Sequence, residues 1–130
     1  MDIVIDASAI LAVLLNEPER ARIIEATRGT DLMAPESLPF EIGNALSALL
    51  RRKLLGTIDG LAVWHGFSAM PIRFVEVDIP TSLMVAGEEG IYAYDAYILT
   101  CAAGYRSPLL TLDKRLTAVA RSRGTALLEV

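Results

Sequence analysis

The sequence predicts an α/β fold, a three-layer α/β/α arrangement around a central, mostly parallel sheet of four to five strands. Short apolar segments, too short for helices, alternate along the chain with longer helical segments. This alternation is typical of βαβ units, whose parallel strands are covered by helices on both faces. No linker, repeat or low-complexity stretch divides the 130 residues, so we expect one domain over residues 1–130.

The expected strands are short and built from β-branched and aliphatic residues. The first begins almost at the N-terminus, and the second is stopped by Pro35. The strands are expected at residues 2–6, 31–34, 73–77, 109–112 and 126–130.

The expected helices are marked by their ends. Pro18 and Pro80 stand at first-turn positions, and Ser37 is a candidate N-cap. Glycine follows several of the expected helix ends, as it commonly does where a helix stops, at positions 56, 90, 104 and 124. The helices are expected at residues 7–15, 18–28, 37–54, 58–70, 80–89, 94–103 and 114–123.

Composition indicates the cellular compartment of the protein more clearly than it indicates a partner. The single Cys101 cannot form an internal disulfide, which favours a reducing compartment. The chain opens on a strand without a basic leader, and no apolar run is long enough to span a membrane. We therefore expect a cytoplasmic protein that does not enter a membrane.

Four acidic residues lie in strongly apolar surroundings. Asp6 ends the first strand, Asp113 ends the fourth, and Asp95 begins a helix. In α/β sheets, ligands bind beyond the carboxyl ends of the strands, so these three residues are expected at one edge. Glu41 lies in the first turns of the long helix, beside its apolar stripe, and can lean toward the same edge. Asn44, three residues later, shares that side of the helix.

Clustered carboxylates need a compensating charge. Like charges about 4 Å apart repel by roughly 4 kcal/mol at an effective dielectric near 20. A cluster therefore implies raised pKa values or a bound cation, and oxygen ligands favour Mg²⁺ or Mn²⁺. The net charge of −4 does not argue against a nucleic-acid partner, because these four acids account for the whole excess of 16 acidic over 12 basic residues.

Each acid also has an alternative structural interpretation. Asp6 and Asp113 each precede a helix and could be N-caps, while Asp95 could be a first-turn acid. Glu41 could be a solvated helix residue. Three of them at one predicted edge nevertheless favour a metal site.

Four sequence segments resemble the PIN-domain ribonucleases, and their order and spacing are most similar to the VapC toxins of toxin–antitoxin pairs. The segments are residues 4–11, 39–46, 94–97 and 110–116. The resemblance implies a PIN-like fold and a Mg²⁺- or Mn²⁺-dependent endoribonuclease. It further implies inhibition by a cognate VapB-type antitoxin and a homodimer. The acidic residues of the family correspond here to Asp6, Glu41, Asp95 and Asp113, as catalytic residues and metal ligands.

Other polar residues receive supporting roles. Ser8 and Thr111 match hydroxyl residues of the family and are expected to hydrogen-bond the acids. Arg52, Lys114 and Arg115 are expected to contact RNA phosphates, although cations at helix ends are also favourable without RNA. The tyrosines between residues 92 and 105 could stack on bases, but packing in the core or at a dimer surface is the preferred interpretation.

An alternative function remains open at this stage. The chain could be a PIN-like module that binds RNA or protein and regulates its partner with little nuclease activity. The presence of all four acids favours the enzyme.

Overall fold

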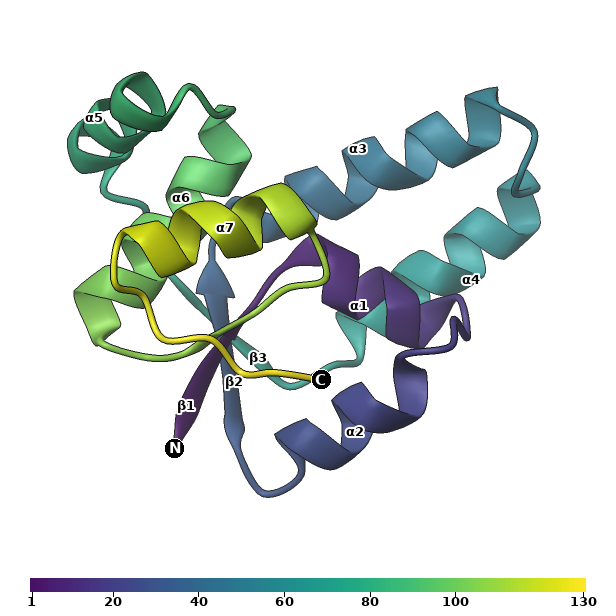
Figure 1. The fold of residues 1–130 in the computed structure, drawn as a ribbon. Coiled ribbons are helices and arrows are strands. Elements are labelled where there is room, and N and C mark those ends of the chain that lie inside the picture. The colour runs from purple at the N-terminus through teal and green to yellow at the C-terminus, as the bar shows by residue number, and fades with distance from the viewer.

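The computed structural model describes residues 1–130 and has one parallel sheet between two layers of helices (Figure 1). This confirms the predicted three-layer α/β/α class. The strands are β1 (Asp2–Ile5), β2 (Asp31–Pro35), β3 (Ile72–Val75) and β4 (Leu109–Leu110). The helices are α1 (Ala7–Leu14), α2 (Arg20–Thr27), α3 (Leu38–Arg51), α4 (Thr57–Ser68), α5 (Ile79–Glu89), α6 (Ala93–Tyr105) and α7 (Lys114–Ser122).

Strand β1 separates two apolar cores because successive side chains of a strand point to opposite faces. Ile3 and Ile5 belong to a core shared with α1, α2, α3 and α4, whereas Val4 belongs to a core shared with α5, α6 and α7. The two helical layers lie on either side of the sheet in Figure 1. Both faces of β1 are therefore buried, which explains its continuous apolar sequence.

The strand order places a topological switch point beside β1. The sheet runs β3-β2-β1-β4, with all neighbouring strands parallel. The chain moves from β1 to β2 to β3 in one direction and then returns to place β4 on the other side of β1. Ligands of open α/β sheets bind at such a reversal, outside the carboxyl ends of the strands. Asp6 and Asp113 follow the two strands that flank this point.

The expected fifth strand at residues 126–130 is wrong. Only a single bridge joins Leu127 to Leu109, with backbone hydrogen bonds on either side of it. The reason is the shortness of β4, which was expected to reach Leu112 but ends at Leu110. Beyond that residue the chain bonds to side chains of the β1–α1 junction instead of continuing the sheet. A two-residue strand offers too little edge for a further strand.

Several helix ends also differ from expectation. Helix α3 ends at Arg51, and Gly56 is the N-cap position of α4 instead of a residue closing α3. Ser37 precedes α3 but its side chain makes no capping hydrogen bond. Helix α6 continues through Gly104 to Tyr105 and is closed by Arg106, which adopts a left-handed conformation with φ 51°.

No helix of this structure is both long and apolar enough to cross a membrane.

Candidate active site

Asp6 is held almost fully buried, with 4% of its surface exposed, at the junction of β1 and α1. Its Oδ1 atom accepts hydrogen bonds from the backbone N–H of Ala9 at 3.1 Å and from the Ser8 hydroxyl at 2.7 Å. Its Oδ2 atom accepts a hydrogen bond from the Thr111 hydroxyl. Because each carboxylate oxygen has about two acceptor sites, Oδ2 keeps one for a further ligand.

The two hydroxyls that bind Asp6 also bind the chain beyond β4. Ser8 Oγ accepts a hydrogen bond from the N–H of Leu112 at 2.9 Å, and Thr111 Oγ1 accepts one from the N–H of Asp113 at 3.1 Å. Each hydroxyl is thus donor and acceptor at once. This network fixes Asp6 relative to the segment that carries Asp113.

Asp113 is exposed and is the N-cap of α7, where its Oδ1 atom accepts a hydrogen bond from the N–H of Leu116 at 2.8 Å. The alternative interpretation of Asp6 and Asp113 as N-caps is therefore correct as far as local structure goes. Capping occupies only part of each carboxylate, so it does not exclude a second role. Asp95 and Glu41 lie in the first turns of α6 and α3.

The four carboxylates lie within electrostatic reach of one another. Burial, together with the charges of Asp6, Asp95 and Asp113, raises the pKa of Glu41 to about 7. Burial also raises the pKa of Asp95, with a contribution from Asp113, while the Arg115 charge opposes the rise. For Asp6, burial raises the pKa and the hydroxyl hydrogen bonds partly offset it. The ionised cluster is therefore destabilised by its own charge.

The carboxylates are near one another without forming a closed ligand cage. No three acidic, cysteine or histidine side chains in the chain converge closely enough to hold one ion by themselves. This spread is consistent with repulsion between like charges and with the capping bonds that orient Asp6 and Asp113.

A pocket of about 720 Å³ adjoins this cluster between α3 and the start of α6. Glu41 and Asp95 border it together with Asn44, which the sequence placed on the same side of α3. The remaining lining is mostly aromatic and comes from Tyr92, Tyr94 and Tyr97. Core packing or a dimer surface was the role expected for these tyrosines. Their position in sequence, within three residues of Asp95, could have indicated that they border the site.

The three basic residues expected at the RNA-binding surface do not line this pocket. Arg52 is exposed at the C-cap of α3, and Lys114 is exposed at the first position of α7. Arg115 donates a hydrogen bond from Nη2 to the carbonyl oxygen of Gly90 at 2.7 Å.

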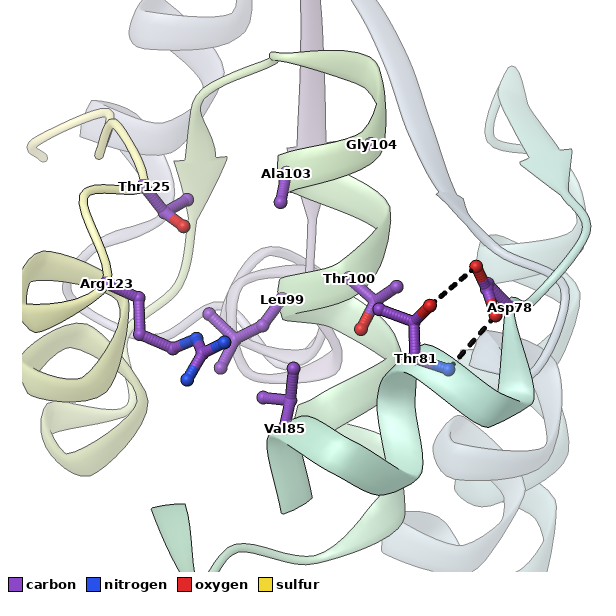
Figure 2. Close-up of a pocket in the computed structure, with 9 residues that line it drawn as sticks. All are labelled: Asp78, Thr81, Val85, Leu99, Thr100, Ala103, Gly104, Arg123 and Thr125. Atoms are coloured by element: carbon purple, nitrogen blue, oxygen red, sulfur yellow. Dashed lines mark hydrogen bonds between the residues drawn. The ribbon is translucent and has the colours of Figure 1, made fainter. Parts of the chain in front are cut away.

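A second cavity, of about 380 Å³, lies between α5, α6 and the end of α7 (Figure 2). Asp78 is the only acid in its lining, and both of its oxygens accept hydrogen bonds from Thr81. Arg123 extends toward this cavity and forms ion pairs with Glu88 and Glu89. None of the predicted site residues borders it, so the carboxylate cluster is the stronger candidate for chemistry.

Comparison with known proteins identifies the family of the chain. The family model described as PIN domain matches residues 3–122. This chain belongs to the PIN-domain family. The PIN domain described above is 33% identical over 118 residues to Ribonuclease VapC9 of Mycobacterium tuberculosis, and the match covers 88% of each chain. It is 30% identical over 114 residues to Ribonuclease VapC12 of the same species, again with 88% of each chain covered.

Solved structures share the fold of this PIN domain. PAE2754 from Pyrobaculum aerophilum superposes with a TM-score of 0.71 at 22% identity, covering 92% of this chain and 79% of that one. VapC20 of Mycobacterium tuberculosis, titled a Sarcin-Ricin loop cleaving toxin, has a TM-score of 0.64 at 15% identity, with 89% and 93% covered. VapBC2 from Rickettsia felis, bound to a promoter DNA fragment, has a TM-score of 0.67 at 11% identity, with 99% and 98% covered.

Proposed function

We propose that this PIN domain is a metal-dependent endoribonuclease that hydrolyses RNA phosphodiester bonds and is the toxin of a toxin–antitoxin pair. The observation that carries the proposal is the placement of four acids at helix N-caps or first turns close to one another, where the charges of Asp6, Asp95 and Asp113 act on Glu41. The similarity to VapC9 and VapC12, both named ribonucleases, supports it. The protein would act in the cytoplasm as a single domain.

The donor set suits Mg²⁺ or Mn²⁺. All four candidate ligands are carboxylates, and Asp6 Oδ2 retains an acceptor site. A divalent cation would relieve the repulsion that raises the pKa values of Asp6, Glu41 and Asp95. When bound, such an ion supplies a water of lowered pKa and stabilises negative charge on the phosphate.

Residues of the chain would position the metal ligand Asp6 and accept a proton during the reaction. Ser8 and Thr111 orient Asp6 through their hydroxyl hydrogen bonds. Glu41 or Asp95 would accept the proton of the attacking water, since Asp6 is already held by three hydrogen bonds. In the proposed reaction water, and not the RNA 2′-hydroxyl, would attack the phosphorus while the P–O3′ bond breaks, so the products would carry a 5′-phosphate and a 3′-hydroxyl.

RNA and protein partners would bind outside the carboxylate cluster. Arg52 and Lys114, both exposed, are proposed to contact backbone phosphates on either side of the cut. The inhibitor would be a VapB-type antitoxin, and the chain would form a homodimer. VapBC2 of Rickettsia felis is a relative in fold that was solved as such a toxin–antitoxin complex.

The test is cleavage of total cellular RNA by the purified chain free of antitoxin. Cleavage should require Mg²⁺ or Mn²⁺, stop with EDTA, and fall by at least about 100-fold in Asp6→Asn and Asp95→Asn. Asp59→Asn is the matched control, since Asp59 is an exposed acid in the first turn of α4, away from the cluster. Cleavage that persists in EDTA and in both site variants would refute the proposal. Binding of RNA without any cleavage would support the regulatory-module alternative.

A further inference from the structure

We propose that the pocket between α3 and the start of α6 binds the base of an unpaired RNA nucleotide next to the scissile phosphate. In this arrangement Tyr92 stacks on the base and Asn44 hydrogen-bonds its edge. The proposal rests on the ribonuclease function proposed above and specifies how that site selects its substrate.

Tyr92 is the first observation. This residue is 83% exposed to solvent although it lies directly beside the carboxylate cluster. The neighbouring Tyr94 and Tyr97 are half-buried and pack edge to face, with ring centroids 6.2 Å apart. Those two rings are therefore engaged within the protein, whereas Tyr92 presents its ring to solvent. Tyr92 is also the N-cap position of α6, so its backbone is held by the helix that carries Asp95.

The charge of the pocket decides which part of a nucleotide fits. Its only acidic or basic side chains, apart from the tyrosine hydroxyls, are Glu41 and Asp95. A phosphate would be repelled from this lining, whereas a neutral, flat base would not. The volume of about 720 Å³ lies within the range of small-molecule sites. Base–aromatic stacking contributes about 1–3 kcal/mol per base.

Asn44 adds the means to read the base. It lies one helical turn after Glu41 on the same side of α3, exposed and in the lining of the pocket. Its amide offers both a donor and an acceptor, as base edges require. Those edges are available only in unpaired RNA, which is where sequence-specific proteins recognise RNA.

The pocket is continuous with the proposed reaction centre. Glu41 and Asp95 border the pocket and also interact electrostatically with Asp113. A nucleotide with its phosphate at the carboxylates would therefore place its own base, or that of the adjoining nucleotide, against Tyr92. The expected substrate is a single-stranded segment whose base beside the cut is splayed out.

The experiment couples a protein ring to an RNA base. A cleavage site is first located by sequencing the ends of total RNA cut by the wild-type protein, and an oligonucleotide containing that site is synthesised. The kcat/KM is then measured for wild type and Tyr92→Ala on this RNA and on versions that lack the base on the 5′ or the 3′ side of the cut. Tyr92→Ala should lower kcat/KM on intact RNA by roughly 5- to 150-fold. Removing one of the two bases should lower the kcat/KM of the wild type by a similar factor. On that abasic RNA, Tyr92→Ala should cause little further loss, because the ring has no base to stack on.

Two variants serve as controls. Tyr92→Phe keeps the aromatic ring and should stay within about two-fold of wild type. Tyr105→Ala removes an exposed tyrosine from the other end of α6 and should leave kcat/KM unchanged. The base pocket would be overturned, while the nuclease function stands, by either of two results. One is that the loss from Tyr92→Ala multiplies with the loss from base removal at both positions. The other is that Tyr92→Ala has wild-type kinetics. Unchanged kinetics with a changed mass in sedimentation would instead assign Tyr92 to a contact between copies of the chain.

Failure of the nuclease function gives a different pattern. If wild type cuts no RNA, single-stranded decamers carrying one 2-aminopurine are titrated with wild type and Tyr92→Ala. Quenching of the 2-aminopurine fluorescence that is lost in Tyr92→Ala would support base stacking without catalysis. Equal quenching by both proteins would overturn the pocket as well.

Discussion

Thr111 donates its hydroxyl hydrogen to Oδ2 of Asp6, across 105 positions of sequence. This bond joins the end of β1 to the segment after β4, at the point where the strand order reverses. With Ser8 on the other oxygen, it leaves the Asp6 carboxylate little freedom to rotate. A buried carboxylate is otherwise costly, and these bonds offset part of that cost by lowering the pKa that burial raises.

Replacement of Thr111 by Val should destabilise the protein in a pH-dependent way. The Thr111 hydroxyl lowers the pKa of Asp6, so its removal raises that pKa further above the ordinary value. A raised carboxyl pKa in the folded state means stability is lost as the acid ionises. We expect a loss of about 1–3 kcal/mol at pH 7 and a smaller one at pH 4, by urea unfolding. Thr57→Val, at an exposed position of α4, is the control. An equal loss at both pH values would contradict this explanation.

Glu41 should make the metal-free protein less stable as the pH rises. Its pKa is about 7 in the folded protein against an ordinary value of 4.5. The folded state therefore holds a proton that the unfolded state has lost, and stability falls between about pH 4.5 and 7. The shift corresponds to about 3 kcal/mol at most. Glu41→Gln should flatten this fall, seen as a smaller decrease in unfolding free energy between pH 5 and 8. Parallel pH profiles for the two proteins would contradict the assignment.

Mg²⁺ should stabilise the protein more at high pH than at low pH. Carboxylates must lose their protons to bind a cation, and a ligand that binds only the folded state raises the melting temperature. With Mg²⁺ or Mn²⁺ at several millimolar, we expect a clear increase in Tm at pH 8 and little at pH 5. The increase should be lost in Asp95→Asn and kept in Asp59→Asn. A Tm increase that is the same at both pH values would indicate non-specific ion binding.

The location of the acids could be predicted because it depends on local patterns. A short apolar run ending in Asp fixes both the strand and the edge at which the acid emerges, as for Asp6 and Asp113. Glu41 could be placed beside the apolar stripe of its helix because the helical period fixes its side. The tie of Ser8 and Thr111 to Asp6 was expected only from family resemblance, since residues far apart in sequence carry no local signal of contact.

The features that could not be predicted from the sequence depend on how the helices and strands pack together. The exposure of Tyr92 and its place in a pocket shared by α3 and α6 depend on tertiary packing, which no local pattern encodes. The missing fifth strand reflects the short edge of β4, because on that side only Leu109 exchanges backbone hydrogen bonds with the C-terminal segment, at Ala126 and Leu128. The end of α6 was misplaced because Gly104 stays helical while Arg106 takes the left-handed turn usually given to glycine.

Arg115 should support structure more than RNA binding. It joins α7 to Gly90, the residue that ends α5, through a hydrogen bond of 2.7 Å. Arg115→Met should cost about 1 kcal/mol of stability and speed amide exchange at Ile91, in the same turn. The salt dependence of RNA binding should stay as in wild type. In Arg52→Ala the slope of log K against log salt should fall by about 1. A similar fall in Arg115→Met would return that residue to the phosphate contacts.

Two helical glycines should respond differently to alanine. Gly87 lies in α5 with open space where a Cβ would stand, so Gly87→Ala should stabilise the protein by about 0.5–1 kcal/mol. A Cβ on Gly66 of α4 would lie 2.9 Å from Leu14 Cδ2, so α4 and α1 must shift or Leu14 must change rotamer. That displacement should cancel the gain in helix propensity for Gly66→Ala. Urea midpoints at constant m-value measure both effects. Equal stabilisation by the two substitutions would show that α1 and α4 adjust to the added Cβ without loss of free energy.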